Sequence, residues 1–157
     1  ALTVVGGKVP LIIELKSYDP VDILCPLVWE ILKDYKGEYC IESFDPKIVA
    51  WFKTYHPHVL RGQLMAHFTG KEPEFNSGFK AFFARNLWTN VVSRPHFEAY
   101  DLHARNNISH RIACGLMKMQ EASWTIRTAE EYRLCKSAGA LCIFEYIRPE
   151  ISDGHEH

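Results

Sequence analysis

The chain has 157 residues, of which 47% are hydrophobic and 24% are charged, and its formal net charge is -1. These values are typical of a soluble globular protein and exclude a disordered or collagen-like chain. The length predicts one domain over residues 1–157. The balanced charge gives no electrostatic basis for binding nucleic acid or an anionic membrane.

No uninterrupted apolar run reaches the roughly 18 residues of a membrane-spanning helix. The chain holds five scattered cysteines and no CxxC pair, which argues against a disulfide framework and against a zinc knuckle. Free thiols are the rule in a reducing compartment, so we expect a cytoplasmic protein.

Strand-like and helical patterns alternate along the chain. In chain order they predict a strand over 11–15, a helix over 22–34, strands over 39–44 and 58–64 with a helix over 46–55 between them, a helix within 65–94, a strand over 97–102, a helix near 109–119, a strand over 123–126, a helix over 128–138 and a strand over 141–144. Residues 150–157 are expected to form a disordered tail.

Three local signals support these boundaries. Gly37 lies just past the first predicted helix, where a C-cap is common. Asp45 precedes Pro46 at the start of the second helix, as an N-cap followed by a proline at the first position. Thr128 is followed three residues later by a glutamate, the spacing of a capping box.

About six strand–helix alternations predict parallel βα units, and two architectures are compatible with them. An open doubly wound sheet would fit in 157 residues, but such a sheet usually carries a glycine-rich turn after its first strand, and residues 16–20 contain no glycine. At about 26 residues per unit, a closed eight-unit barrel would need about 209 residues, about two units more than the chain contains. The pattern alone leaves both open.

The sharpest local feature is the pair Glu14 and Lys16 at the end of the first predicted strand. Residues two apart in a strand project from the same face. The carboxyl ends of parallel strands are where α/β folds build their sites. A carboxylate there could bind Ca²⁺ or Mg²⁺, and the ammonium could hold a phosphate oxygen. The alternative is a simple ion pair at a strand end.

Several segments together resemble the glycerophosphodiester phosphodiesterase family. They are PLIIELK, GEYCIESFDPKIVAWFKTYHP, HVLRGQL, SWTIRTAEEY and ALCIFEYIRP, which occur in the family's order from Pro10 to Pro149. The resemblance implies a TIM-type (β/α)₈ barrel, of which this chain covers about six of the eight βα units. It also implies metal-dependent hydrolysis of glycerophosphodiesters to an alcohol and glycerol 3-phosphate.

Carried onto this sequence, the resemblance makes Glu14 the metal-ligating glutamate and Lys16 the lysine that holds the substrate phosphate. Trp124 would line the pocket for the glycerol or leaving group, and Ser43 and Phe44 would be pocket scaffolding. The implied cofactor is a divalent ion, Ca²⁺ or Mg²⁺.

The family's catalytic His-Arg and Glu-x-Asp segments, and its second catalytic histidine, have no counterpart in this chain. The resemblance places them upstream of the first predicted strand, and the histidines present lie in other segments. Arg127 and Glu145 also stand where the family often has Asn and Asp. Without two general acid–base groups, we expect no significant phosphodiesterase activity from this chain alone.

Two main functional hypotheses follow, and a third is weaker. The first is a phosphodiesterase seen as its third to eighth units, and the alternative is a non-catalytic binding or assembly module built on a barrel remnant. Because the missing strands would leave sheet edges bare, we expect self-association or pairing with a segment that supplies them. A third possibility, an unrelated doubly wound binding domain, would bind its ligand at a topological switch point.

Overall fold

The computed structural model of the chain describes residues 1–65, 93–102 and 119–149. Its strands are β1 (Leu11–Glu14), β2 (Tyr39–Ser43), β3 (Leu60–Met65), β4 (Phe97–Asp101), β5 (Gln120–Ile126) and β6 (Leu141–Phe144). Its helices are α1 (Leu2–Val5), α2 (Val21–Leu32), α3 (Pro46–Tyr55) and α6 (Ala129–Ser137). The predicted tail at 150–157 and the helices predicted within 65–94 and near 109–119 fall almost entirely outside the described residues.

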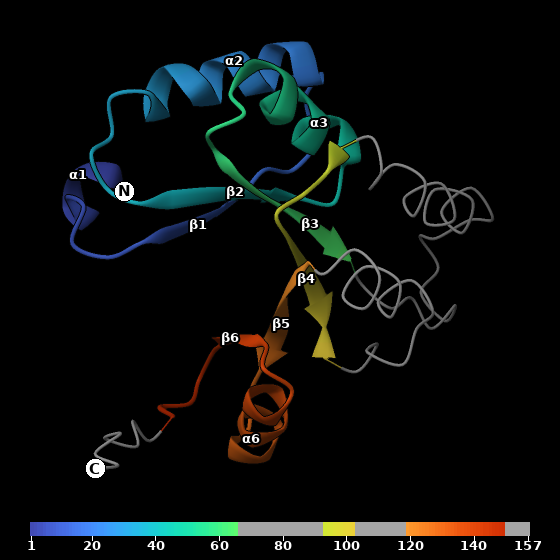
Figure 1. Ribbon diagram of the computed structural model, residues 1–157. Coiled ribbons are helices and arrows are strands. Elements are labelled where there is room, and N and C mark those ends of the chain that lie inside the picture. Colours follow the sequence, from blue (N-terminus) through green and yellow to red (C-terminus); the bar gives the residue numbers. More distant parts are fainter. Residues whose placement is uncertain (66–92, 103–118, 150–157) are drawn as a thin grey trace.

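The six strands form one sheet in which every neighbouring pair is parallel and the spatial order follows the chain order, from β1 to β6. A doubly wound sheet reverses its strand order at a switch point, and none of the six described strands does so. In Figure 1 the strand direction turns steadily from β1 and β2 to β5. The sheet is therefore a curled half-barrel, which confirms the barrel-type α/β fold and excludes the doubly wound alternative.

Two helix starts are fixed by the predicted caps. The Asp45 carboxylate accepts a 2.9 Å hydrogen bond from the backbone N–H of Lys47, and Pro46 is the first residue of α3. At α6 the Thr128 hydroxyl and the Glu131 carboxylate accept from each other's backbone N–H groups, which completes a capping box. Both predictions are confirmed.

Three other boundaries differ from the sequence prediction. Helix α2 ends at Leu32, so Gly37 is not its C-cap. The short helix α1 was not predicted, because four residues carry too little periodicity to detect. Strand β5 begins at Gln120 rather than Ser123. The sequence pattern missed these first residues because Glu121, although buried, is charged and interrupts the apolar run.

The two faces of the sheet pack against different partners. On one face, α2 and α3 cover a cluster that consists of Leu15, Cys25, Leu32, Ile41, Ile48, Phe52 and Val59. On the opposite face, the interior of the half-barrel, side chains from β3, β4 and β5 form a second cluster of Leu64, Ala99 and Ala122, with Phe44, Phe97, Trp124 and Ile143 packed against it. Phe44, the residue after β2, brings the carboxyl end of that strand to this interior cluster.

None of the described helices is long and apolar enough to cross a membrane.

Candidate functional site at the carboxyl ends of the strands

Glu14 and Glu42 are register partners at the ends of β1 and β2, so their side chains project from the same face of the sheet. The alternate residues Ile13 and Ile41 pack on the opposite face, beneath α2 and α3. The two carboxylates therefore belong to the interior of the half-barrel, on strands that parallel pairing holds about 4.8 Å apart.

The two glutamates have very different environments. Glu14 is exposed, whereas Glu42 is 8% exposed and its Oε2 atom is buried with no hydrogen-bond partner. Burial, with the neighbouring charge of Glu14 as a second cause, raises the pKa of Glu42 to about 7. A desolvated carboxylate beside a second carboxylate is stabilised by sharing a proton or by a bound cation.

This acidic pair fits part of a coordination sphere for a hard divalent ion. Ca²⁺ and Mg²⁺ take oxygen ligands, usually six or more including water. In the described part of the chain, no group of three or more His, Cys, Asp or Glu side chains is placed to hold a metal ion. The pair could therefore supply two carboxylate ligands, and the unpartnered Oε2 of Glu42 is the atom that a cation would satisfy.

A hydrogen-bond chain through Ser43 joins the ends of β1 and β2. The Ser43 hydroxyl donates to the Leu15 carbonyl at 2.6 Å and accepts from the Asp45 N–H at 3.0 Å. Leu15 itself donates from its N–H to the Glu42 carbonyl at 2.8 Å. Because Leu15 separates Glu14 from Lys16, these bonds fix the backbone on which both predicted site residues stand.

Gln63 holds the end of β2 from the side of β3. Its side chain is fully buried on β3, and its Nε2 donates to the carbonyls of Ser43 and Phe44 at 3.0 and 3.1 Å. Ser43 and Phe44, which the family resemblance made scaffolding, are thus held by two neighbouring strands.

Trp124 projects from β5 into the interior cluster and meets Phe44 edge-on, with ring centroids 6.1 Å apart and an interplanar angle of 85°. The ring is half-buried, and its Nε1 is buried without a hydrogen-bond partner. The indole therefore packs on the interior face that Glu42 borders, and its N–H is left without a partner among the described residues.

Gly62 leaves room for the Phe97 ring on the interior face beside Glu42. Gly62 pairs in register with Glu42 on one side and with Phe97 on the other. A Cβ atom at Gly62 would lie 2.2 Å from the Phe97 ring. The ring therefore occupies the space that only a glycine leaves free.

Lys16 is less constrained than the sequence pattern predicted. Strand β1 ends at Glu14, so Lys16 is an exposed loop residue and the alternation argument does not fix its direction. Within the described residues it makes no ion pair, with Glu14 or any other carboxylate. The simple strand-end ion pair considered as an alternative is therefore not formed.

A cavity of about 560 Å³ opens nearby, between the β1–α2 and β2–α3 loops. It is lined by Ser17, residues 19–22, Asp45, Lys47 and Trp51. Glu14, Lys16 and Trp124 do not line it, so this cavity is separate from the interior that Glu42 and Trp124 border.

The two departures from the family pattern contact each other. Arg127, just after β5, donates from Nε to the Glu145 carboxylate at 2.7 Å, just after β6. Both side chains are substantially exposed. The pair joins the last two described strands at the carboxyl edge, where the resemblance implied an Asn and an Asp.

Sequence reasoning missed Glu42 and Gln63. The available signal for Glu42 was a charged residue at the end of an otherwise apolar strand, at the position equivalent to Glu14. For Gln63 the signal was an amide inside an apolar strand, which requires hydrogen-bond partners when buried.

The curled parallel sheet defines the protein as a barrel-type α/β fold. Its acidic pair lies at the carboxyl ends of the strands, where barrels of this type have their active sites. No protein-family model and no curated protein matches the sequence. The similar solved structures narrow the class to the glycerophosphodiester phosphodiesterase fold.

A Silicibacter pomeroyi protein described as a glycerophosphoryl diester phosphodiesterase matches with a TM-score of 0.67 and 15% identity, over 91% of this chain and 50% of its own. A glycerophosphodiester phosphodiesterase from Parabacteroides distasonis matches with a TM-score of 0.63 and 15% identity, over 86% and 52%. An Oleispira antarctica phosphodiesterase in complex with its product sn-glycerol-3-phosphate matches at 0.58 and 12%, over 83% and 49%.

The chain spans about half the length of these structures. The resemblance inferred from the motifs is therefore confirmed at the level of the fold: the chain forms a partial barrel of the kind found in glycerophosphodiester phosphodiesterases.

Proposed function

We propose that this chain contributes the third to eighth βα units of a metal-dependent hydrolase that cleaves glycerophosphodiesters to an alcohol and glycerol 3-phosphate. The observation that carries the proposal is the desolvated Glu42 carboxylate paired in register with Glu14 at the carboxyl edge of this fold. The product bound to the Oleispira antarctica phosphodiesterase supports the substrate class.

In this proposal Glu14 and Glu42 hold a Ca²⁺ or Mg²⁺ ion, which when bound offsets phosphate charge. Lys16 extends from the end of β1 and attracts a phosphate oxygen as a point charge. Trp124 and Phe44 form an apolar wall against the glycerol carbons, with the indole N–H available to a hydroxyl.

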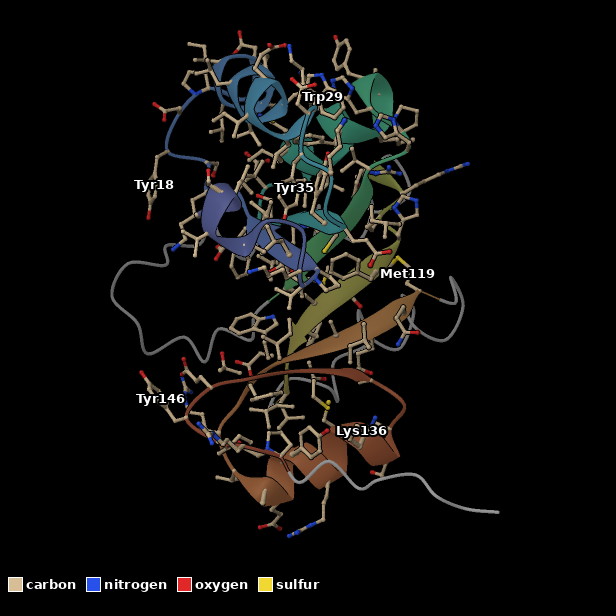
Figure 2. The ribbon with its side chains drawn as sticks, turned by 90° about the vertical axis from the view of Figure 1, so that its left-hand side faces the viewer. Tyr18, Trp29, Tyr35, Met119, Lys136 and Tyr146 are labelled. Carbon is tan, nitrogen blue, oxygen red and sulfur yellow. The ribbon has the colours of Figure 1, made fainter. Side chains whose placement is uncertain are left out.

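Cleavage also requires a general acid and a general base. The three described histidines make other contacts. His56 stacks on Trp29, which Figure 2 labels, with ring centroids 3.7 Å apart, and His58 meets the same ring edge-on at 5.6 Å. His96 accepts a hydrogen bond from the Arg61 N–H at 3.2 Å. Because the family's two catalytic histidines have no counterpart in this sequence, we expect the chain by itself to bind cation and phosphate without turning over substrate.

Terbium luminescence and calorimetry with Ca²⁺ and Mg²⁺ test the cation site directly. Glu14→Gln and Glu42→Gln should each weaken cation binding at least about tenfold, because each removes one of two charged ligands. Glu38→Gln, an exposed carboxylate outside the pair, is the matched control and should bind as the unsubstituted chain does. Equal affinity in all four proteins, or an equal loss in the control, would refute the site.

Binding of glycerol 3-phosphate in the presence of the cation tests the substrate class. Lys16→Met should weaken it, while Lys36→Met, at an exposed position between α2 and β2, should not. Hydrolysis of glycerophosphocholine by the purified chain at a rate typical of enzymes would show that our assignment of the acid and base to residues outside the chain is wrong.

A second candidate is a non-catalytic assembly module, and one observation favours it. Among the described strands, β1 and β6 each have a single neighbour. Unpaired strand edges invite pairing with another chain, and the exposed side chain of Ile12 on β1 adds apolar surface at this edge. We propose self-association, or pairing with a segment that supplies further strands. A compact monomer in multi-angle light scattering over a wide concentration range would contradict it.

A further inference from the structure

Two cysteines that the proposed site does not use lie against each other at the far end of the sheet. The Cys142 thiol donates to the Cys135 sulfur, and the two Sγ atoms are 2.8 Å apart. Unbonded heavy atoms prefer roughly 3.5–4.0 Å, whereas a disulfide needs about 2.05 Å. An approach of roughly 0.8 Å would therefore bring the sulfurs to bonding distance.

The fold, rather than the local sequence, brings these sulfurs together. Cys135 is in the last turns of α6, and Cys142 is in the middle of β6, after the turn at Gly139. Both belong to a cluster with Leu102, Ile126 and Ala140 on the helix-covered face of the sheet. This is the face opposite to Ile143, which packs in the interior near Trp124.

We propose that Cys135 and Cys142 are a redox-reactive dithiol that forms a reversible intramolecular disulfide and pins the edge strand β6 to α6. Cys25 and Cys40, the other described cysteines, are also free thiols, and no hydrogen bond joins either of them to another described sulfur. Among the described cysteines, the proposed modification site is therefore confined to α6 and β6, and it is independent of the proposed hydrolase function.

A small-molecule disulfide such as glutathione disulfide is the oxidant. The half-buried Cys142, as thiolate, attacks one glutathione sulfur, and the glutathione S–S bond breaks to release one glutathione thiol. Cys135 then loses its proton and attacks the Cys142 sulfur, which releases the second glutathione thiol. The protein loses two protons and two electrons, and the oxidant gains both.

The order of attack follows from burial. Cys135 is fully buried, and this burial together with the adjacent Cys142 thiol raises the pKa of Cys135 to about 12. Cys135 therefore reacts poorly with a reagent from solution, but its sulfur lies in contact with the sulfur of Cys142. The first step takes place on Cys142, and the second is favoured by contact rather than by thiolate abundance.

Peptide mapping of the unsubstituted chain gives a direct readout. Trypsin cleaves after Arg133 and after Lys136, so it separates Cys135 from Cys142; Lys136 is labelled on α6 in Figure 2. After incubation with glutathione disulfide and alkylation of the remaining thiols, the tripeptide 134–136 should appear cross-linked to the peptide that begins at Ser137. The free thiols should fall from five to three.

The folded arrangement, not only the short spacing, should favour this bond. Each protein disulfide consumes one glutathione disulfide and releases two glutathione thiols, so the equilibrium is measured by the ratio of the glutathione disulfide concentration to the square of the glutathione thiol concentration. At half-oxidation this ratio should be at least about tenfold lower in the native chain than in concentrated urea, because the fold holds the thiols together. Absence of the cross-linked peptide, a link between chains instead, or an equal ratio in both conditions would overturn the proposal.

Single variants separate the two steps. Cys135→Ser should stop the reaction after the first step and leave glutathione on Cys142, whereas Cys142→Ser should leave Cys135 reduced. Cys40→Ser is the matched control, because Cys40 is also half-buried, and it should not alter the cross-link. The result on the unsubstituted chain decides the matter even if a variant fails to fold.

Discussion

Replacement of Glu42 by glutamine should make the metal-free chain more stable at neutral and alkaline pH. The pKa of Glu42 is raised from 4.5 to about 7, mainly by burial and further by the charge of Glu14. A carboxyl group whose pKa is raised in the folded state contributes stability below its unfolded pKa and loses it as the pH rises through the folded value. The loss therefore falls between about pH 4.5 and pH 7.

The size of this loss follows from the shift. A difference of about 2.5 units corresponds to about 3.4 kcal/mol as an upper bound. Relaxation and the solvent access of the exposed Glu14 reduce the effect to roughly 1–3 kcal/mol. Glutamine has nearly the same shape and no charge at any pH, so the variant escapes this loss.

Urea unfolding in buffer with a chelator, at about pH 5 and about pH 8, measures the effect as a double difference. The stability advantage of Glu42→Gln over the unsubstituted chain should grow by roughly 1–3 kcal/mol between the two values. Glu38→Gln should follow the pH profile of the unsubstituted chain. Parallel profiles for Glu42→Gln and the unsubstituted chain would refute the reasoning. Added Ca²⁺ should then recover stability in the chain that keeps Glu42 and not in the variant.

Three further substitutions test the scaffold. Ser43→Ala leaves the Leu15 carbonyl without its donor and should cost about 1–2 kcal/mol in urea unfolding; an unchanged midpoint would mean that water replaces the hydroxyl. Gly62→Ala drives a methyl group into the Phe97 ring and should cost about 1–3 kcal/mol, partly recovered in a double variant with Phe97→Leu; no recovery would place the strain elsewhere. Thr128→Ala removes the α6 cap and should reduce the free energy of unfolding by about 1 kcal/mol, which a lower melting temperature would report. Thr128→Ser keeps the hydroxyl and should leave the melting temperature unchanged.

The sequence pattern predicted the alternation of elements and their parallel βα units, because helix caps and apolar periodicity are local properties. The choice of a barrel over a doubly wound sheet came from the family resemblance. The caps at Asp45 and Thr128 set the starts of α3 and α6 as expected. Helix α2 shows the limit of this reasoning: a glycine after a helical pattern indicates that the helix has ended, but Gly37 does not fix the position of the last turn.

The sequence pointed to part of the candidate site. Glu14 stands at a strand end as expected, but its partner Glu42 acquires importance only from the β1–β2 register, which no pattern within one strand reveals. Gln63 reads as an irregularity in an apolar strand until its contacts with the next loop are known. The nearness of Cys135 and Cys142 likewise depends on how β6 returns along α6.

Because the spatial order of the strands follows the chain order, each strand is hydrogen-bonded only to those before and after it. Such an arrangement behaves as a nearest-neighbour array, whose ends open more readily than its middle. Backbone amides of β3 and β4 should thus exchange with solvent more slowly than those of β1. Glu14 belongs to β1, the strand at one end of this order, and only the hydrogen bonds between β1 and β2 set its distance from Glu42. A partner that pairs with β1 would therefore make the distance between the two carboxylates less variable. It would change the affinity of the proposed site for a cation without contacting the cation.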